Sequence, residues 1–233
     1  MLLSIDTSSK NSGVALIRKD YSIINSIEWA TEYNHTPDLL PTIDRILTES
    51  KVNIVNLKGI AINIGPGQFS GLRVGVTTAK TISWSYNVPI VVSNSLEILA
   101  YSHKSSTPTI ICPIINLNKI QMAWSLFRSS DGKLTKIQEP AIIPKDDLLE
   151  KITSTINKLG YMCKKSVIIC EEAIENLLYF ERLNNIEITN TTSSERIINL
   201  AKIGMEKLNN NEMTDPTSLE PFYLRPPTIN KTK

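Results

Sequence analysis

A strand, a glycine-rich loop and a helix follow one another between residues 59 and 86, and this unit restricts the fold more than any other segment. Residues 59–64 alternate isoleucine with smaller residues, which is the period of a β-strand. The loop at residues 65–73 breaks that strand with three glycines and a proline. Residues 70–86 are predicted to be helical, with Ser70 as the N-cap. The succession indicates an α/β fold.

The glycine-rich loop has two interpretations. Gly65 and Gly67 would let backbone amides approach a phosphate, and the helix N-terminus would add positive partial charge. A tight connection between strand and helix explains the same composition. The loop alone does not decide between a nucleotide site and a turn.

Small residues form a stripe along the predicted helix. Gly71, Gly75, Ala79 and Ser83 recur every four residues and therefore share one face. Glycine inside a helix costs about 1 kcal/mol relative to alanine, so the stripe implies close packing. The neighbour can be the helix expected at residues 36–50, another subunit, or both, and ordinary packing within the chain explains the spacing equally well.

The other periodic segments predict two units. Strands are expected at residues 2–6, 13–18, 21–29 and 89–92, in a mixed sheet packed with helices 36–50 and 70–86. We predict a first lobe at 1–103 joined by 209–225, a smaller second lobe at 104–208, and a flexible tail at 226–233. The second unit is expected to contain strands at 110–115, 121–127, 134–137 and 167–170, and helices at 146–159 and 194–208.

Composition excludes several classes of function. The net charge is only +2, with 25 basic and 23 acidic side chains, which argues against a chain that grips nucleic acid by its own charge. Three cysteines without CxxC spacing indicate buried thiols in a reducing cytoplasm. No segment is apolar enough to span a membrane, and we expect no secretory signal.

Candidate catalytic groups are few. A bis-histidine metal centre would need both His35 and His103, since the chain has 2 histidines. His103 is expected to be exposed to solvent. No serine lies in a GxSxG elbow. The adjacent acidic pairs at residues 146–147 and 171–172 would point to different sides of a helix or a strand, so we interpret them as surface charges.

Four blocks carry a resemblance to a known family. Residues 65–75 read GPGQFSGLRVG and resemble the GPGSFTGLRIG signature of the TsaB (YeaZ) family. Residues 3–8 (LSIDTS), 35–41 (HTPDLLP) and 221–225 (PFYLR) are similar to its opening strand and DTS turn, its HxxxLLP helix start and its PxYLR end. Residues 116–119 (NLNK) depart from the D-A-R-R-like segment of the family.

The resemblance implies two ribonuclease-H-like lobes of the actin-like ATPase superfamily. It also implies a degenerate site: Asp6, Thr7, Ser8, Gly65 and Gly67 would be vestiges of nucleotide binding. No glycine follows Asp6, and Leu39 stands where the catalytic paralogue has its second metal-binding histidine. No cofactor and no metal are therefore expected, although weak nucleotide binding stays possible.

The function implied is a non-catalytic scaffold subunit that dimerises with TsaD. It would support threonylcarbamoyl transfer to the tRNA adenosine beside the anticodon, with TsaE as the ATPase partner, tRNA contacted through the complex, and a homodimer when alone. The interface would comprise His35, Leu39, Leu40, Ile43, Leu47, Gly71, Leu72, Gly75, Val76, Ala79 and Ser83. The alternative is a nucleotide hydrolase or a kinase-like enzyme that uses Asp6 and residues 65–67.

Overall fold

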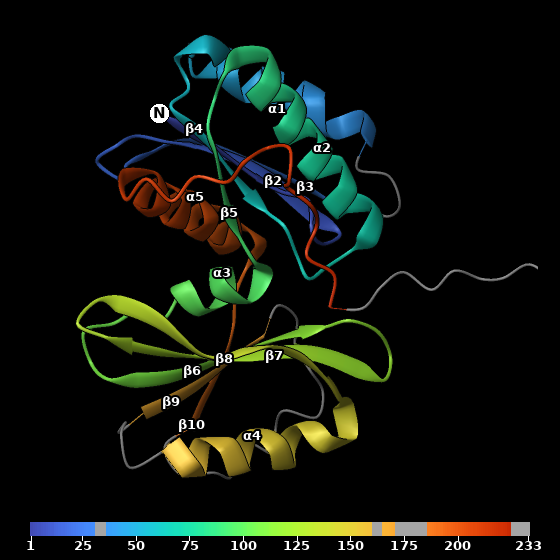
Figure 1. The fold of residues 1–233 in the computed structure, drawn as a ribbon, viewed down its shortest axis with the longest axis vertical. Helices are drawn as coiled ribbons and strands as arrows, with labels where there is room; N and C mark the ends of the chain where they lie inside the picture. Colours follow the sequence, from blue (N-terminus) through green and yellow to red (C-terminus); the bar gives the residue numbers. More distant parts are fainter. Residues whose placement is uncertain (31–35, 160–164, 171–185, 225–233) are drawn as a thin grey trace, which may run out of the picture.

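The computed structural model describes residues 1–30, 36–159, 165–170 and 186–224. They form two lobes, each built on a five-stranded mixed sheet, as the fold prediction requires (Figure 1). The first lobe contains β1 (Leu2–Asp6), β2 (Asn11–Ile17), β3 (Ile23–Ala30), α1 (Thr36–Glu49), a short 3₁₀ turn (Ile54–Asn56), β4 (Gly59–Asn63), α2 (Phe69–Tyr86) and β5 (Ile90–Ser93).

The first sheet has the strand order β3-β2-β1-β4-β5. β1, β4 and β5 are parallel, and β2 is antiparallel to both of its neighbours. α1 and α2 cover one face, and α5 (Ser193–Asn209) covers the other (Figure 1). The carboxyl ends of β1 and β4 therefore lie side by side, at the edge where open α/β sheets place their sites.

α5 corrects the predicted division into lobes. The prediction assigns residues 194–208 to the second lobe, but the apolar face of α5 packs on the first sheet. Leu200 and Ala201 join a buried cluster with Leu2 and Ala15, and a Cβ atom added to Gly204 would overlap the Cβ of Ala61. Helical periodicity reveals an apolar face and does not say which of two sheets it covers.

The second lobe contains β6 (Thr109–Asn116), β7 (Gln121–Ser130), β8 (Lys133–Pro144), α4 (Lys145–Leu159), β9 (Lys165–Cys170) and β10 (Ile186–Asn190). Its strand order is β10-β9-β6-β7-β8. α4 covers the outer face, and α3 (Ser95–Tyr101) lies between the two sheets (Figure 1). Residues 117–120 connect β6 to β7, and they include three of the four residues that depart from the family pattern.

The chain crosses between the lobes through α3 and again between β10 and α5. Charged contacts join α5 to α3 and to the residues just after α3. Lys207 Nζ lies 2.8 Å from Glu97 Oε2, and Lys104 Nζ lies 2.6 Å from Glu206 Oε1. Tyr101 also donates to Glu206 at 2.8 Å. The sequence patterns did not predict α3, although Asn94 caps it through a bond to Glu97 N.

Residues 214–224 return along the first lobe. Thr214 N donates to Ile90 O at 2.8 Å, and Phe222 N donates to Ile64 O at 2.7 Å. In the described part of the chain, no helix is long and apolar enough to cross a membrane. The predictions for His35, Cys163, residues 171–172 and the tail 226–233 fall outside the described residues.

Candidate functional site

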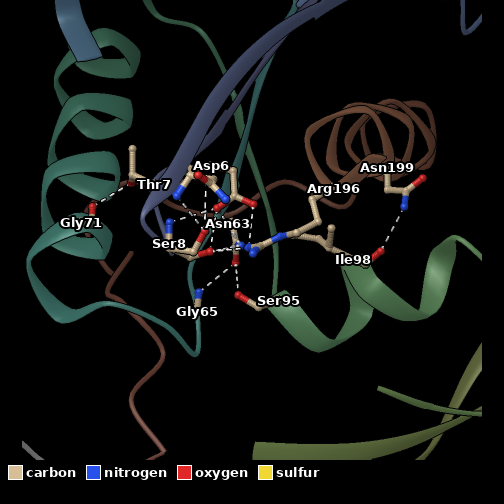
Figure 2. Close-up of polar contacts among 12 residues, drawn as sticks. Asp6, Thr7, Ser8, Asn63, Gly65, Gly71, Ser95, Ile98, Arg196 and Asn199 are labelled. Carbon is tan, nitrogen blue, oxygen red and sulfur yellow. Dashed lines mark hydrogen bonds and ion pairs between the residues drawn. The ribbon is translucent and has the colours of Figure 1, made fainter. Parts of the chain in front are cut away.

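The turn after β1 is organised by the carboxylate of Asp6. Its Oδ1 accepts hydrogen bonds from Ser8 N at 3.0 Å, Ser8 Oγ at 2.7 Å and Asn63 Nδ2 at 3.0 Å. Figure 2 shows these groups converging between β1 and β4. Asp6 therefore has the structural role of holding the turn amide.

Arg196, in the first turns of α5, completes the charge balance of this site. Its Nη2 lies 3.0 Å from Asp6 Oδ2 and donates to Ser8 Oγ at 2.6 Å (Figure 2). The two charged side chains are 5% and 4% exposed, respectively. Both oxygens of the carboxylate are thus engaged, one of them by an internal cation. Sequence reasoning missed Arg196, since 190 positions separate it from Asp6 and no local pattern links them.

Asn63 connects this pair to the rest of the first lobe. Its amide group donates to Ser8 Oγ at 2.9 Å, and its Oδ1 accepts from Gly65 N at 2.9 Å and Ser95 Oγ at 3.0 Å. One buried side chain therefore joins the β1 turn, the glycine-rich loop and the start of α3. The position of Asn63, last in a buried strand beside the loop, was the available signal for this residue.

The glycine-rich loop packs directly on the β1 turn. Gln68 N donates to Ser8 O at 2.6 Å, and a Cβ atom on Gly67 would overlap that carbonyl oxygen. Gly65 has φ +106°, a conformation that favours glycine. A backbone oxygen of the protein itself thus lies against this loop, as the tight-connection interpretation requires.

The start of α2 corrects one cap assignment. The helix begins at Phe69, its N-cap is Gln68, and no side-chain cap bond is present there. The prediction that Ser70 caps this helix is therefore wrong. Ser70 is exposed within the first turn instead.

The small-residue stripe faces the lobe's own sheet. Thr7 Oγ1 donates to Gly71 O at 2.7 Å, and a Cβ atom on Gly75 would overlap that hydroxyl and lie 3.2 Å from Ile62 Cδ1. The close neighbours of α2 along this stripe are therefore the β1 turn and β4. This is the intramolecular alternative that the spacing left open.

The same burial applies to most of the predicted interface. Leu40 is 58% exposed, whereas its neighbours in that prediction belong to the core of the lobe. These buried residues are Leu39, Ile43, Leu47, Gly71, Leu72, Gly75, Val76, Ala79 and Ser83. The apolar faces that periodicity identified cover the sheet, so in the free chain they are not a surface for another subunit.

The outward side of α2 is also lined by small side chains. Ser70, Thr77, Thr81 and Ser85 are exposed and Val74 is half-buried. We call these five residues the outer ridge of α2. Sequence reasoning missed this ridge because periodicity draws attention to apolar positions, and its members are mostly hydroxyl residues.

His103 and the described cysteines have altered acidity. Burial is the main cause that lowers the pKa of His103. This residue is half-buried, so the prediction that it is exposed to solvent is wrong. Burial also raises the pKa of the Cys170 thiol to about 12 and that of Cys112 well above its usual range. Both cysteines are free and buried, as expected. In the described ranges, no group of three or more histidine, cysteine, aspartate or glutamate side chains could hold a metal ion.

Comparison with known sequences identifies relatives over most of the chain. The TsaD family model, described as tRNA N6-adenosine threonylcarbamoyltransferase, matches residues 29–180. The tRNA threonylcarbamoyladenosine biosynthesis protein TsaB of Bacillus subtilis is 32% identical over 151 residues, which are 65% of each chain. TsaB of Buchnera aphidicola subsp. Baizongia pistaciae is 33% identical over 159 residues, 66% of this chain and 70% of that protein.

The transferases themselves are matched over a shorter stretch. The tRNA N6-adenosine threonylcarbamoyltransferase of Persephonella marina is 30% identical over 111 residues, and the match covers 41% of this chain and 32% of that protein. The chain therefore spans slightly less than two thirds of the Bacillus TsaB and about a third of this transferase.

Solved structures confirm the fold. YeaZ from Pseudomonas aeruginosa superposes with a TM-score of 0.70 at 19% identity, covering 95% of this chain and 98% of that one. A putative N-acetylmannosamine kinase from Listeria monocytogenes gives 0.52 at 10% identity, covering 91% and 99%. The prediction of two ribonuclease-H-like lobes is thus confirmed. Together with the matched family model and the TsaB relatives, this places the chain in the TsaB (YeaZ) family of tRNA threonylcarbamoyladenosine biosynthesis proteins.

Proposed function

We propose that this chain is a non-catalytic scaffold subunit. It docks a TsaD-type transferase and supports transfer of the threonylcarbamoyl group to the tRNA adenosine beside the anticodon, in the cytoplasm. Catalysis belongs to the transferase, and ATP hydrolysis belongs to a TsaE-type partner. The observation that carries this proposal is the ion pair between Asp6 and Arg196, 3.0 Å apart and buried.

The ion pair argues against phosphate chemistry at this turn. A metal-bound phosphate at Asp6 would have to displace the guanidinium of Arg196, and a buried cation without its partner is strongly destabilising. The amide of Gln68 at the start of α2 already donates to Ser8 O at 2.6 Å. The acid and the helix start, the two groups on which an enzyme would depend, thus stabilise the fold of the lobe.

The docking surface that we propose is the outer ridge of α2 together with Leu40 of α1. Small side chains along the ridge let the backbone of a partner helix come close, and Leu40 is an exposed apolar anchor, 58% accessible. This surface replaces the buried residues of the sequence-based prediction. In the absence of the transferase, a second copy of the chain would use the same surface.

The test of docking is a double substitution, Leu40→Arg with Thr81→Arg. Both side chains are exposed, so we expect the monomer to keep its far-ultraviolet circular dichroism and its melting temperature. The double variant should no longer form a complex with the transferase from the same cell. Size-exclusion chromatography with light scattering measures this loss. Ser154→Arg on the exposed side of α4 is the matched control. Full assembly by the double variant would exclude this surface.

The test of the scaffold role is reconstitution of the modification. The transferase, the TsaE-type ATPase, tRNA and the threonylcarbamoyl donor are combined with and without this chain, and the modified nucleoside is quantified by mass spectrometry. We expect product to depend on the chain, and a folded Asp6→Asn variant to support a similar rate. A variant that assembles fully and yet abolishes turnover would favour the enzyme alternative.

A further inference from the structure

A trough runs between α2 and the returning C-terminal segment, and neither the fold nor the proposed docking surface accounts for it. Its hollow has a volume of about 310 Å³. The polar and aromatic groups that line it include Arg73, Thr77, Lys80, Glu220 and Tyr223. The two basic residues stand on α2 seven positions apart, or about 10 Å along the helix axis.

The guanidinium of Arg73 is held in place by aromatic side chains. It lies 4.1 Å from the centroid of the Phe69 ring, and its Nε donates to Tyr223 Oη at 3.2 Å. The rings of Phe69 and Tyr223 stack with their centroids 5.0 Å apart. These contacts use the Nε and one face of the guanidinium. The two terminal NH₂ groups have no hydrogen-bond partner among the described residues, so they can donate to a ligand in a bidentate manner.

Lys80, seven positions beyond Arg73 on α2, is also held by its neighbours. Its Nζ donates to Leu219 O at 3.1 Å and lies 5.4 Å from the centroid of the Trp84 ring. The carbonyl engages one of the three ammonium protons. Trp84 is 57% exposed, so its indole offers a flat apolar surface at this end of the trough.

The local charge favours an anion. Among the described residues that line the hollow, Glu220 is the one acid, against two cations. Asp215 is close enough to Lys80 to be affected by its charge, but its carboxylate accepts from Thr217 N at 2.8 Å and Thr217 Oγ1 at 2.6 Å within its own turn. Spaced cations with an exposed aromatic ring are the combination by which proteins follow a nucleic-acid strand: cations for phosphates and a ring for a base.

We propose that this trough binds the sugar-phosphate backbone of tRNA while a docked TsaD-type partner holds the RNA, an inference that rests on the proposed function. Thr77 belongs both to the outer ridge and to the trough, so a strand in the trough would run along the edge of the docked partner. The net charge of +2 is compatible with this role, because two phosphate contacts add to the affinity of a complex and do not by themselves retain RNA.

The experiment uses the complex of the full chain with the transferase and a fluorescently labelled tRNA. The Kd is measured by anisotropy between 50 and 300 mM salt. For Arg73→Gln with Lys80→Gln we expect the Kd to rise about tenfold, and the slope of log K against log salt to fall by roughly 1 for each lost phosphate contact. For Trp84→Leu we expect a Kd at least about fivefold higher at an unchanged slope.

The control is Lys151→Gln with Lys158→Gln on α4, which removes the same charge from exposed positions of the other lobe. A trough variant that matches this control in Kd and slope overturns the proposal. If the trough variant no longer co-elutes with the transferase, the trough is part of a protein interface, and the RNA assignment is overturned too. If the wild-type chain itself forms no complex, the proposed function fails, and the trough proposal fails with it.

Discussion

Asp6 and Arg196 come from opposite ends of the sequence and meet in the interior of the first lobe, with 4% and 5% of their side chains exposed. Removing two charges from water is costly, and a buried ion pair is often no more stabilising than apolar residues of the same volume. What the pair contributes is a defined geometry. It joins the start of α5 to the turn after β1, and Ser8 and Asn63 satisfy further lone pairs and protons.

Arg196→Met should therefore destabilise the protein strongly. It leaves the carboxylate of Asp6 buried without its cation, and we expect the free energy of unfolding to fall by about 3–5 kcal/mol. Urea denaturation followed by circular dichroism measures this loss. Arg45→Met is the matched control: the ion pair of Arg45 with Glu49 spans 3.8 Å and both side chains are more than half exposed, so its loss should cost at most about 1 kcal/mol. Equal losses would contradict a structural role for Arg196.

His103 predicts a pH dependence of stability. Burial lowers the pKa of its imidazole and Lys165 lowers it further, while Glu187 and Glu195 oppose the shift. The unfolded chain therefore binds the proton more readily than the folded one, and stability should fall as the pH drops below the usual histidine pKa of about 6.5. Melting temperatures of wild type and His103→Gln between pH 5 and pH 8 test this. The variant should show a shallower decline, and an equally steep one would assign the effect to other groups.

α2 lies unusually close to the β1 turn. Gly75→Ala places a methyl group against Thr7 Oγ1. We expect a loss of about 1–3 kcal/mol from overpacking, measured by chemical denaturation. In a Thr7→Ala background the added cost of Gly75→Ala should be smaller, because the overlapping hydroxyl is gone. Ser85→Ala, on the exposed side of the same helix, should change stability by less than about 0.5 kcal/mol. Strict additivity of the two substitutions would mean that α2 shifts away from the turn.

The contacts between α3 and α5 predict how firmly the lobes are joined. Glu206 accepts from Tyr101 at 2.8 Å and from Lys104 at 2.6 Å, so Glu206→Gln removes the charge that both bonds use. Hydrogen exchange followed by mass spectrometry should show faster exchange of the α3 amides in this variant, with the strands of both sheets unaffected. Glu150→Gln, exposed on α4, is the control. Unchanged protection of α3 would place the rigidity of the junction in its apolar contacts.

The elements that the sequence predicted well are strands with an uninterrupted apolar run and helices long enough for their apolar face to repeat over several turns. β1, β4, α1 and α2 lie within a few residues of their expected bounds. α3 was missed because its seven residues give too few turns for a period to appear. The stripe at Gly71 and Gly75 was placed on one face correctly, but spacing is the same whether the neighbour is a sheet or a second protein. Arg196 was not identified because the partner of a buried charge depends on tertiary structure.

The same fold occurs in a protein described as a putative N-acetylmannosamine kinase, so nucleotide binding is a direct test of the scaffold assignment. We expect 1 mM MgATP to leave the melting temperature of the chain unchanged, because the turn that would meet phosphate is occupied by Arg196 and Ser8 O. A ligand present at a hundred times its Kd adds about 2.7 kcal/mol of stability, which differential scanning fluorimetry detects easily. A reproducible rise that Asp6→Asn abolishes would support the kinase-like alternative.

The position of α5 has a consequence for the order in which the chain can fold as it is synthesised. The sheet face around Leu2, Ala15 and Ala61 is covered by α5, which ends at Asn209. The described strands of the second lobe and α4 all lie between residues 109 and 190, so that lobe can bury its core earlier. The first lobe, whose strands leave the ribosome first, therefore completes its core last. A nascent chain interrupted before α5 would carry all five strands of its first sheet and still leave one face of that sheet bare.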